Sequence, residues 1–539
     1  MLHCSVMTHL THVPGSGTAP PGSHQVLAQG DASSSIEDTI NGLFNPVSEW
    51  FSNIVFAEVP VFGASVPWIV AWLVVAALVF TIVFGAVQFR LFPLAVNMIR
   101  GKYTNKDEPG EINHFQALSS AVSGTVGLGN IAGVGVAVTV GGAGATFWMI
   151  MCGLLGMATK FVECTLGVRY REVAADGTVS GGPMHYLRKG IAERIPGSFG
   201  AGLGRVLAAL SAVMILFFAL AGGNMFQANQ MFAQLRDITG GETGPLGSDV
   251  AALGVGIALA VLIGAVIIGG ITSIGAVTSR LVPAMAVVYV LACLVVIGGN
   301  ITSVPSAVAE IISGAFTPEA GFGGVLGVLV IGFQRAAFSN EAGIGSSPIA
   351  HSAVRTKHPV TEGIVALLEP FIDTVIVCTM TALTIVIAQS QFWIDGQQAV
   401  LSGGEEPDGV TVTSESFATV LPWFPYVLTL AVALFAISTI ITWGYYGQRA
   451  WEYLFGKGRA RMHVYNVLFC LGVVVGCVLT LSSVLDFADA VLFALALFNI
   501  TGLYIMIPVV KEELTSYLGK LRSGEITRVD EDGDKTGAR

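Results

Sequence analysis

Long runs of apolar residues with few or no charges follow one another along most of the chain, separated by short polar connections. A helix needs about 20 residues to cross the hydrocarbon core of a membrane, and the runs reach that length. They predict eleven transmembrane helices, in the ranges 66–89, 115–140, 145–170, 205–235, 250–269, 281–299, 321–350, 362–389, 421–447, 462–482 and 485–510. Only 12% of the residues are charged, against about 25% in a soluble domain, so we expect an all-α polytopic membrane protein.

Residues 1–65 are a different kind of segment, because they contain no Lys or Arg and so lack the basic start of a signal peptide. From Ser35 onward, apolar residues recur on one helical face, at Ile36, Ile40, Leu43, Phe44, Val47, Phe51 and Ile54. This spacing predicts a short amphipathic helix lying on the membrane surface, kinked at Pro46.

Basic residues lie almost entirely in alternate connections, with Arg236 as the exception, whereas connections 300–320 and 390–420 hold acidic residues and no basic ones. Because cytoplasmic loops carry the excess of Lys and Arg, we expect an N-terminus outside, a cytoplasmic C-terminus and a location in the cell (inner) membrane. No Lys- and Arg-rich tract indicates a nucleic-acid partner. The seven scattered cysteines favour neither a disulfide framework nor a zinc site.

Within the second predicted helix, five glycines fall in the twelve residues 124–135. Each glycine costs a helix about 1 kcal/mol relative to alanine, so this helix is expected to open there. Backbone freed inside a bilayer has to be satisfied by protein or by a water-lined cavity. The pattern therefore predicts a broken helix that has a functional role.

The ten predicted helices after the first divide into two sets of five, in residues 115–299 and 321–510, with 66–93 as an additional helix and 511–539 as a cytoplasmic tail. Five is odd, so the second set would cross the membrane in the opposite sense, as in the inverted repeats of transporters. A second break is then expected in the first helix of the second set. Residues 339–348 supply it, and residues 343–346 (Gly-Ile-Gly-Ser) read like residues 127–130 (Gly-Leu-Gly-Asn).

Two interpretations of the paired breaks remain open. Small residues at helical spacing also make close helix-packing seams. The polar residues and the proline beside the glycines favour a binding site; these are Asn130, Asn340, Ser346 and Pro348. Two facing breaks offer N–H groups to a carboxylate and carbonyl groups to an ammonium or sodium ion, which suits a small amino acid.

Several segments together make the chain resemble the alanine or glycine:cation symporter family, also called sodium:alanine symporters. They are residues 115–135, 142–148, 160–167, 181–184, 224–229, 340–351 and 438–447. The resemblance covers the chain after about residue 60. It implies the amino acid-polyamine-cation superfamily, a leucine-transporter-like 5+5 inverted repeat with broken first and sixth core helices, and alternating access. Residues 125–130 are also similar to the unwound first helix of neurotransmitter:sodium symporters.

The resemblance implies that the Asn130 amide oxygen helps to coordinate sodium near the substrate, and that Ser438 and Thr439 supply hydroxyls to a second sodium. The expected sodium ligands are Ser123, Val126, Asn130, Ser438 and Thr439. The expected substrate-binding residues are Thr125, Gly129, Asn130, Gln227, Gly343, Ile344, Gly345, Ser346, Thr439 and Trp443. The alternatives are a helix–helix hydrogen bond for Asn130, hydroxyls bonded to their own helix for Ser438 and Thr439, and packing for Trp443.

Gln227 is chosen from the amides of residues 224–230 because Asn224 shares its helical face and amides in a membrane helix are costly unless paired. For Asn229 the alternatives are capping and packing.

Charged residues within the predicted helices are expected to pair. Lys160 and Glu163 stand one turn apart, and so do Glu369 and Asp373, one of which is expected to be protonated or to meet Arg335. The three histidines His185, His351 and His358 are assigned to cytoplasmic loops without ligand spacing.

The function expected from these features is sodium-coupled symport of a small neutral amino acid, alanine or glycine, with sodium as the coupling ion, the lipid bilayer as surroundings and no other cofactor. The alternatives are a proton-coupled symporter of a small zwitterion and, third, a channel. An enzyme is disfavoured, because the chain has no His-Glu-x-x-His, Gly-x-Ser-x-Gly or Walker A sequence.

Overall fold

The computed structural model of the chain describes residues 46, 48–61, 64–103, 108–175, 177–267, 270–317, 324–479, 481–526, 528–529 and 535–536. Within these residues, seven helices are long and apolar enough to cross a membrane, or eight if one strongly bent pair is counted as a single span. The all-α membrane architecture is therefore confirmed. The number eleven stays a prediction, although each of the eleven predicted ranges contains a helix or a broken helix.

The first set of helices begins with the bent pair α5 (His114–Thr125) and α6 (Ala132–Val140), joined by the 3-10 turn η1 (Leu128–Asn130). The helices that follow are α7 (Ala145–Arg169), α9 (Ser198–Leu220), the π-helical turn η2 (Ala221–Met225), α10 (Phe226–Ile238), α11 (Asp249–Ile267) and α12 (Gly270–Gly299). The helix α5 starts where it does because Asn113 and Gln116 form a reciprocal capping box.

The second set begins in the same way, with α14 (Gly324–Asn340) and the short α15 (Ser347–His351) on either side of a break. It continues with α16 (Pro359–Ala366), α17 (Leu368–Pro370), the π-helical η5 (Phe371–Cys378), α18 (Thr379–Ala388), α21 (Phe424–Phe455), α22 (Arg459–Gly476) and α23 (Leu481–Ile505). The break predicted for this helix is thus observed, at the place that the repeat requires.

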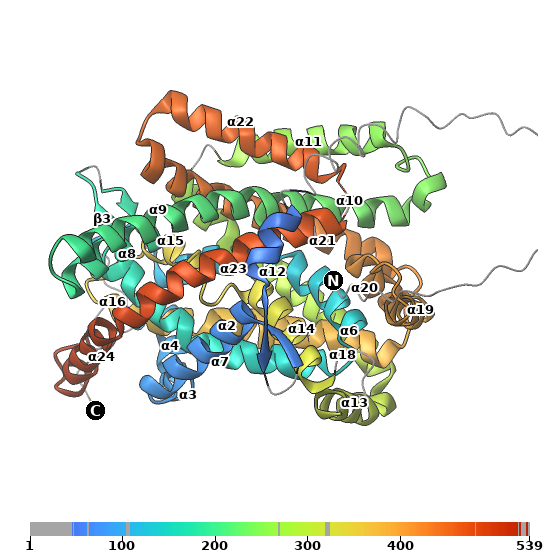
Figure 1. Ribbon diagram of the computed structural model, residues 1–539, viewed down its shortest axis with the longest axis horizontal. Coiled ribbons are helices and arrows are strands. Elements are labelled where there is room, and N and C mark those ends of the chain that lie inside the picture. The colour runs from blue at the N-terminus through green and yellow to red at the C-terminus, as the bar shows by residue number, and fades with distance from the viewer. Residues whose placement is uncertain are drawn as a thin grey trace, which may run out of the picture.

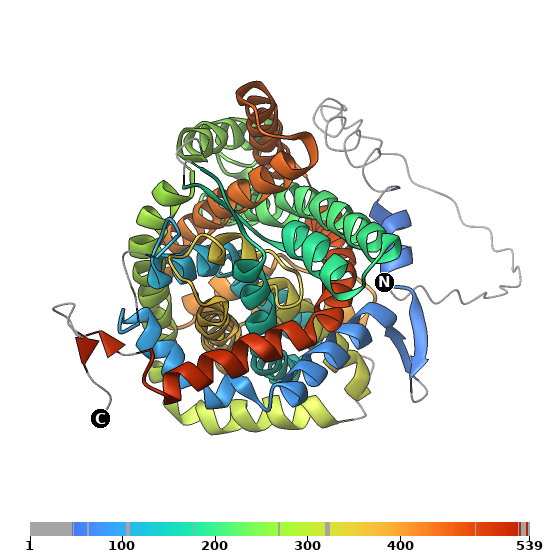
Figure 2. The ribbon, with the colours of Figure 1, turned by 90° about the vertical axis from the view of Figure 1, so that its left-hand side faces the viewer.

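The helices pack in a membrane-type bundle (Figure 1), in which α11 and α22 lie side by side along one edge. The view from one end (Figure 2) shows green, orange and red helices around central segments in teal and yellow, the colours of residues near 150 and 350. Trp68–Val83 forms α2, the additional helix, which packs on α7 and α23. The shorter elements are α3 (Val87–Arg90), α4 (Phe92–Ile99), α8 (Pro183–Arg194), α24 (Ile507–Arg522) and the hairpins β1 (Glu58–Val61) with β2 (Ala64–Pro67), β3 (Glu172–Val173) with β4 (Val179–Ser180) and β5 (Arg528–Val529) with β6 (Lys535–Thr536).

The predicted amphipathic helix falls partly outside the described residues, since residues 36–45 and 47 are not among them. Residues 48–55 are helical, and the Ser52 hydroxyl donates to the backbone carbonyl of Asp486 at 3.3 Å. The predicted kink at Pro46 stays a prediction.

The two acidic connections are not simple loops. Connection 300–320 contains the 3-10 turn η4 (Ile301–Ser303) and α13 (Val304–Phe316), and connection 390–420 contains α19 (Gln391–Leu401) and α20 (Gly409–Ala418). Helix α20 packs directly on α6, where the Thr413 hydroxyl donates to the Ile131 carbonyl at 3.1 Å. These helices cover the ends of the bundle opposite the predicted cytoplasmic side.

At the predicted cytoplasmic side, one arginine ties the two broken helices together. The Arg171 guanidinium donates to the carbonyl of Pro109, before α5, at 2.9 Å, and to the carbonyls of Ser352 and Val354, after α15, at 2.7 and 2.5 Å. Because Ile112 and Val354 also form a backbone bridge, the entry to α5 and the exit from α15 are one connected unit.

Candidate functional site

The first break turns the chain by 60° between α5 and the segment that starts at Leu128. The helix ends because Val126 leaves the helical conformation, with ψ of 88°, and Gly127 is extended, with φ of −136°. The Asn130 side-chain oxygen accepts a hydrogen bond from the Gly127 N–H at 2.9 Å, which satisfies one freed donor. Asn130 therefore shapes the break with the same oxygen that the resemblance assigns to sodium.

Two side chains from other helices hold this break. The Gln227 side-chain oxygen accepts from the Leu128 N–H at 3.0 Å, and its amide donates to the Gly222 carbonyl at 3.0 Å. A Cβ on Gly127 would stand 2.5 Å from the Thr439 hydroxyl and 3.1 Å from the Gln227 oxygen. Glycine is needed here because the two side chains approach the backbone closely.

The hydroxyl groups predicted for a sodium site do come together. Ser123 donates to the Ser438 carbonyl and Thr439 donates to the Ser123 carbonyl, both at 3.1 Å. The Thr442 hydroxyl lies 3.1 Å from the Ser123 hydroxyl, and all of these side chains are buried. Ser438 also bonds back to the Phe435 carbonyl at 2.9 Å, as the structural alternative requires, whereas Thr439 reaches across to α5.

On its other side, the Asn130 amide donates to the Asp373 carboxylate at 2.7 Å. The second oxygen of this carboxylate accepts from the Ser339 hydroxyl at 2.9 Å and from the Thr374 hydroxyl at 2.7 Å. Asp373 is fully buried, and each of these donors is neutral. The helix–helix hydrogen bond weighed for Asn130 thus exists, and its partner is Asp373, a carboxylate that was expected to be protonated or to meet Arg335.

The second break carries three residues with positive φ, namely Glu341 at +55°, Gly343 at +95° and Gly345 at +86°. Glu341 accepts hydrogen bonds from the Ser346 hydroxyl and from the Trp443 ring N–H, the latter at 3.2 Å. The carboxylate therefore joins two predicted substrate-binding residues.

The first break lies against the end of α14, just before the second break, and both breaks are enclosed by neighbouring helices. A Cβ on Gly129 would lie 3.4 Å from the Ser339 Cα, and one on Gly345 would lie 3.0 Å from the Tyr186 hydroxyl. Asn499 donates to the Gly343 carbonyl at 2.8 Å, while the Ile344 side chain is completely buried. The Thr125 hydroxyl bonds back to its own helix, at 3.4 Å from the Val122 carbonyl. The structure thus places Gln227 and Thr439 at the first break and Ser346 and Trp443 at Glu341 of the second, whereas Gly343 and Gly345 face Ile500, Tyr186 and Asn499.

The predicted pairings of charged residues are wrong in their partners. Lys160 pairs with Glu369 at 3.1 Å instead of with Glu163, and Arg335 pairs with Asp489 instead of with Glu369 or Asp373. The reason is that the observed partners come from neighbouring helices, Glu369 from α17 and Asp489 from α23. Glu163 instead accepts from Asn499 at 2.5 Å.

The histidine assignment is wrong for His351 and His185. His351 is the last residue of α15 and is fully buried, with Nδ1 2.5 Å from Glu362 and Nε2 3.6 Å from Glu369. Glu362 also contacts His114 of α5, so a chain of buried ionisable groups links both broken helices. His185 lies on α8 rather than in a loop.

Asn224 and Asn229 are packing residues. Asn224 donates to the Phe469 carbonyl at 2.7 Å and Asn229 to the Leu479 carbonyl at 2.6 Å. Among the amide side chains of residues 224–230, Gln227 is the one whose hydrogen bonds, within the described part of the chain, reach a break.

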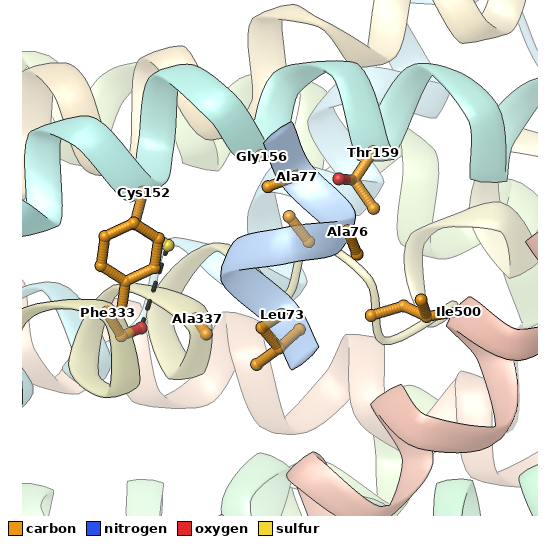
Figure 3. A pocket seen from close by; sticks show the side chains of 10 residues that line it. Leu73, Ala76, Ala77, Cys152, Gly156, Thr159, Phe333, Ala337 and Ile500 are labelled. Atoms are coloured by element: carbon orange, nitrogen blue, oxygen red, sulfur yellow. Dashed lines mark hydrogen bonds between the residues drawn. The ribbon is translucent and has the colours of Figure 1, made fainter. Parts of the chain in front are cut away.

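Two hollows lie near these elements without being the site itself. A cavity of about 10 Å³ beside the second break is lined mainly by apolar side chains of α2, α7, α14 and α23, among them Leu73, Cys152, Phe333 and Ile500 (Figure 3). It is too small for an amino acid, since a single water needs about that volume.

The second hollow is a cleft of about 530 Å³ at the predicted cytoplasmic side, between α8 and the end of α21, with Lys189 and Arg449 in its wall. Burial lowers the pKa of His185 in this cleft to about 4, against the opposing effect of Glu172. Two of its cations are engaged, since Lys189 lies 2.8 Å from Glu172 and Arg449 2.9 Å from Glu452.

Comparison with known proteins gives a consistent result. The model of the sodium:alanine symporter family matches residues 49–531. The sodium/alanine symporter AgcS of Methanococcus maripaludis is 37% identical over 460 residues, which are 85% of this chain and 96% of AgcS. The probable sodium/glutamine symporter GlnT of Bacillus subtilis is 29% identical over 83% of this chain and 87% of its own length.

Among solved structures, the crystal structure of MhsT in complex with L-phenylalanine matches with a TM-score of 0.53 at 14% identity, over 74% of this chain and 88% of MhsT. At this identity the match shows the fold alone, which is leucine-transporter-like. The chain is thus a multi-pass membrane protein of the sodium:alanine symporter family, a family of secondary transporters.

Proposed function

We propose that this protein is a sodium-coupled symporter of small neutral amino acids, alanine and glycine above all, that works by alternating access in the cell (inner) membrane with its N-terminus outside and its C-terminus in the cytoplasm. The observation that carries the proposal is the approach of the first break to the end of α14, beside the second break, with Gln227 and Thr439 at the first break and Trp443 at the second. The repeats proposed to move against each other are residues 115–299 and 321–510, flanked by the tail 1–65, the helix 66–93 and the tail 511–539.

Sodium is proposed to bind to oxygen atoms of Ser123, Val126, Asn130, Ser438 and Thr439, as hard cations prefer oxygen ligands. We add Asp373 to this set. Its carboxylate is buried among neutral donors, and a buried charge is costly unless it is paired. A cation beside Asn130 and Asp373 would remove that cost.

The substrate is proposed to contact Thr125, Gly129, Asn130, Gln227, Gly343, Ile344, Gly345, Ser346, Thr439 and Trp443. Crowding argues for a small side chain. A Cβ on Gly223 would lie only 2.2 Å from the Trp443 ring, so the ring is pressed against that backbone and leaves little space to spare. This favours alanine or glycine over glutamine, the substrate in the name of the relative GlnT.

Proton coupling is the second candidate, and one observation favours it. The buried groups His114, Glu362, His351, Glu369 and Lys160 lie in consecutive contact, and such chains in membrane helices serve as proton relays. In this alternative a proton carried by this chain would take the place of sodium as the coupling ion.

Uptake into proteoliposomes tests the proposal. Labelled alanine is expected to accumulate when sodium is higher outside, and excess glycine is expected to compete more strongly than excess glutamine. Uptake that follows a pH gradient and ignores sodium would replace sodium by protons as the coupling ion. Conductance far above carrier turnover, without counter-flow, would indicate a channel.

Three substitutions locate the site in the same assay. Asn130→Ala, Gln227→Ala and Asp373→Asn are expected to abolish uptake, while the purified proteins remain folded in detergent. Asn224→Ala is a matched control, because this nearby amide bonds to the Phe469 carbonyl and not to a break. Normal uptake by Asn130→Ala and Gln227→Ala would remove the site from the breaks, and unfolding of both would favour the packing interpretation.

A further inference from the structure

Glu341 occupies a position that is unfavourable in three ways. It has a left-handed backbone conformation, with φ of +55°, which is uncommon for a residue other than glycine. It directly follows the last residue of α14, where the helix dipole is negative and a second negative charge is repelled. Its side chain is also only 2% exposed. Such strain and charge persist where surrounding structure enforces them, and they concentrate at functional sites.

No cation of the described residues forms an ion pair with Glu341. Its two oxygens accept from the Ser346 hydroxyl and the Trp443 ring, which are neutral donors. Lys160, the nearby cation on α7, donates instead to Ser347 and Glu369. Each carboxylate oxygen has more than one lone pair, so Glu341 can accept further hydrogen bonds.

We propose that the Glu341 carboxylate binds the ammonium group of the transported amino acid, and that Ser346 and Trp443 orient it for this contact. The inference rests on the proposed function and deepens it. An ammonium group supplies both a positive charge and three N–H donors, which match a carboxylate in a site without a cation. The negative end of α14 adds to the attraction, so the bound ammonium group would offset both the burial of the carboxylate charge and its position at the negative helix end.

The ammonium fits this position better than sodium does. Glu341 accepts from one O–H donor, Ser346, and one N–H donor, Trp443. The hydroxyl groups that suit sodium lie elsewhere, around α5, where Ser123, Thr439 and Thr442 are close together. Asp373 lies beside Asn130. The two cationic ligands of a sodium symporter therefore have separate acidic partners, Glu341 for the substrate and Asp373 for the ion. The site should accordingly recognise amino acids and reject the hydroxy acids of the same shape.

Binding of alanine and of lactate to the purified full-length protein, at saturating sodium, tests this inference. Lactate keeps the carboxylate and methyl group of alanine and replaces the ammonium by a hydroxyl. Wild-type protein is expected to bind alanine at least about 100-fold more tightly than lactate. In Glu341→Gln the ratio of the alanine affinity to the lactate affinity is expected to fall by about 10- to 100-fold, which corresponds to the free energy of one charge-assisted hydrogen bond. Glu163→Gln removes another buried carboxylate, the one that accepts from Asn499, and should keep the wild-type ratio.

The possible outcomes separate a failure of the Glu341 inference from a failure of the proposed function. If Glu341→Gln binds alanine but keeps the wild-type ratio, the inference is wrong and the proposed function stands. If Glu341→Gln does not fold, the wild-type protein still decides, because equal binding of lactate and alanine excludes an ammonium site. A wild-type protein that binds neither, with or without sodium, overturns the proposed function and the inference together.

Discussion

In the first break Gly127 has an extended backbone, with φ of −136°, and a Cβ there would collide with Thr439 and Gln227. In the second break Gly343 and Gly345 have φ of +95° and +86°, a conformation that other residues rarely adopt. The residues around these glycines read almost alike in the two segments. One break thus needs glycine for the approach of side chains, and the other needs it for the path of its own backbone.

The two breaks also differ in charge. The first is closed by the neutral side chains of Asn130, Gln227 and Thr439, and its acidic partner Asp373 comes from η5. The second carries its own carboxylate, Glu341. The two breaks can therefore offer different chemistry to an ion and to a zwitterion, as the proposed symport requires.

The largest effect is expected from Gly127→Ala. The added methyl group must displace the Thr439 hydroxyl, which would lie 2.5 Å from it. Overpacking costs about 1–3 kcal/mol, which corresponds to about 10- to 100-fold weaker alanine binding. Binding and the midpoint of thermal unfolding would be measured. Adding Thr439→Ala should restore the midpoint but not sodium-dependent binding. A midpoint that stays low in the double variant would contradict crowding as the role of Gly127.

A smaller effect is expected from Gly343→Ala, through the backbone. A left-handed conformation costs about 1–2 kcal/mol in a residue with a Cβ, so the midpoint of thermal unfolding should fall. The nearest atom to the new methyl group is the Ile500 Cδ1 at 3.1 Å, the far end of a flexible side chain. Ile500→Val should therefore fail to rescue the variant. If Ile500→Val restored the unfolding midpoint of Gly343→Ala, both breaks would need glycine because of crowding by neighbouring side chains.

The sequence was enough to predict most of this arrangement because its signals are local or repeated. Long apolar runs predicted the helices. The second break was predicted from the first, because ten helices divide into two repeats of five and the first helix of each repeat should be broken. Gln227 was found because an amide in a membrane helix needs a partner, and its partner is indeed the first break.

The sequence was not enough where contacts between distant helices decide the outcome. The spacing of Lys160 and Glu163 suggested a pair, but Glu369 lies closer to Lys160 across the helix interface. His351 was assigned to a loop because the predicted helix ended one residue earlier, whereas its partner Glu362 comes from α16, after the end of that helix. Glu341 received no predicted binding role, because its positive φ and its contact with Trp443 exist only in three dimensions.

The smallest effect, of opposite sign, is expected at Gly254, an exposed glycine inside α11 and away from both breaks. A Cβ at Gly254 would meet no atom within 4 Å, and its φ is not positive. Neither crowding nor a left-handed backbone therefore requires glycine at this position. Gly254→Ala should stabilise the protein by about 0.4–1 kcal/mol, because alanine restricts the unfolded chain and favours the helix. Thermal unfolding in detergent and alanine uptake would be compared with wild type, and uptake should be unchanged. A loss of stability as large as that of Gly343→Ala would mean that glycine itself, and not its place in a break, is what these helices require.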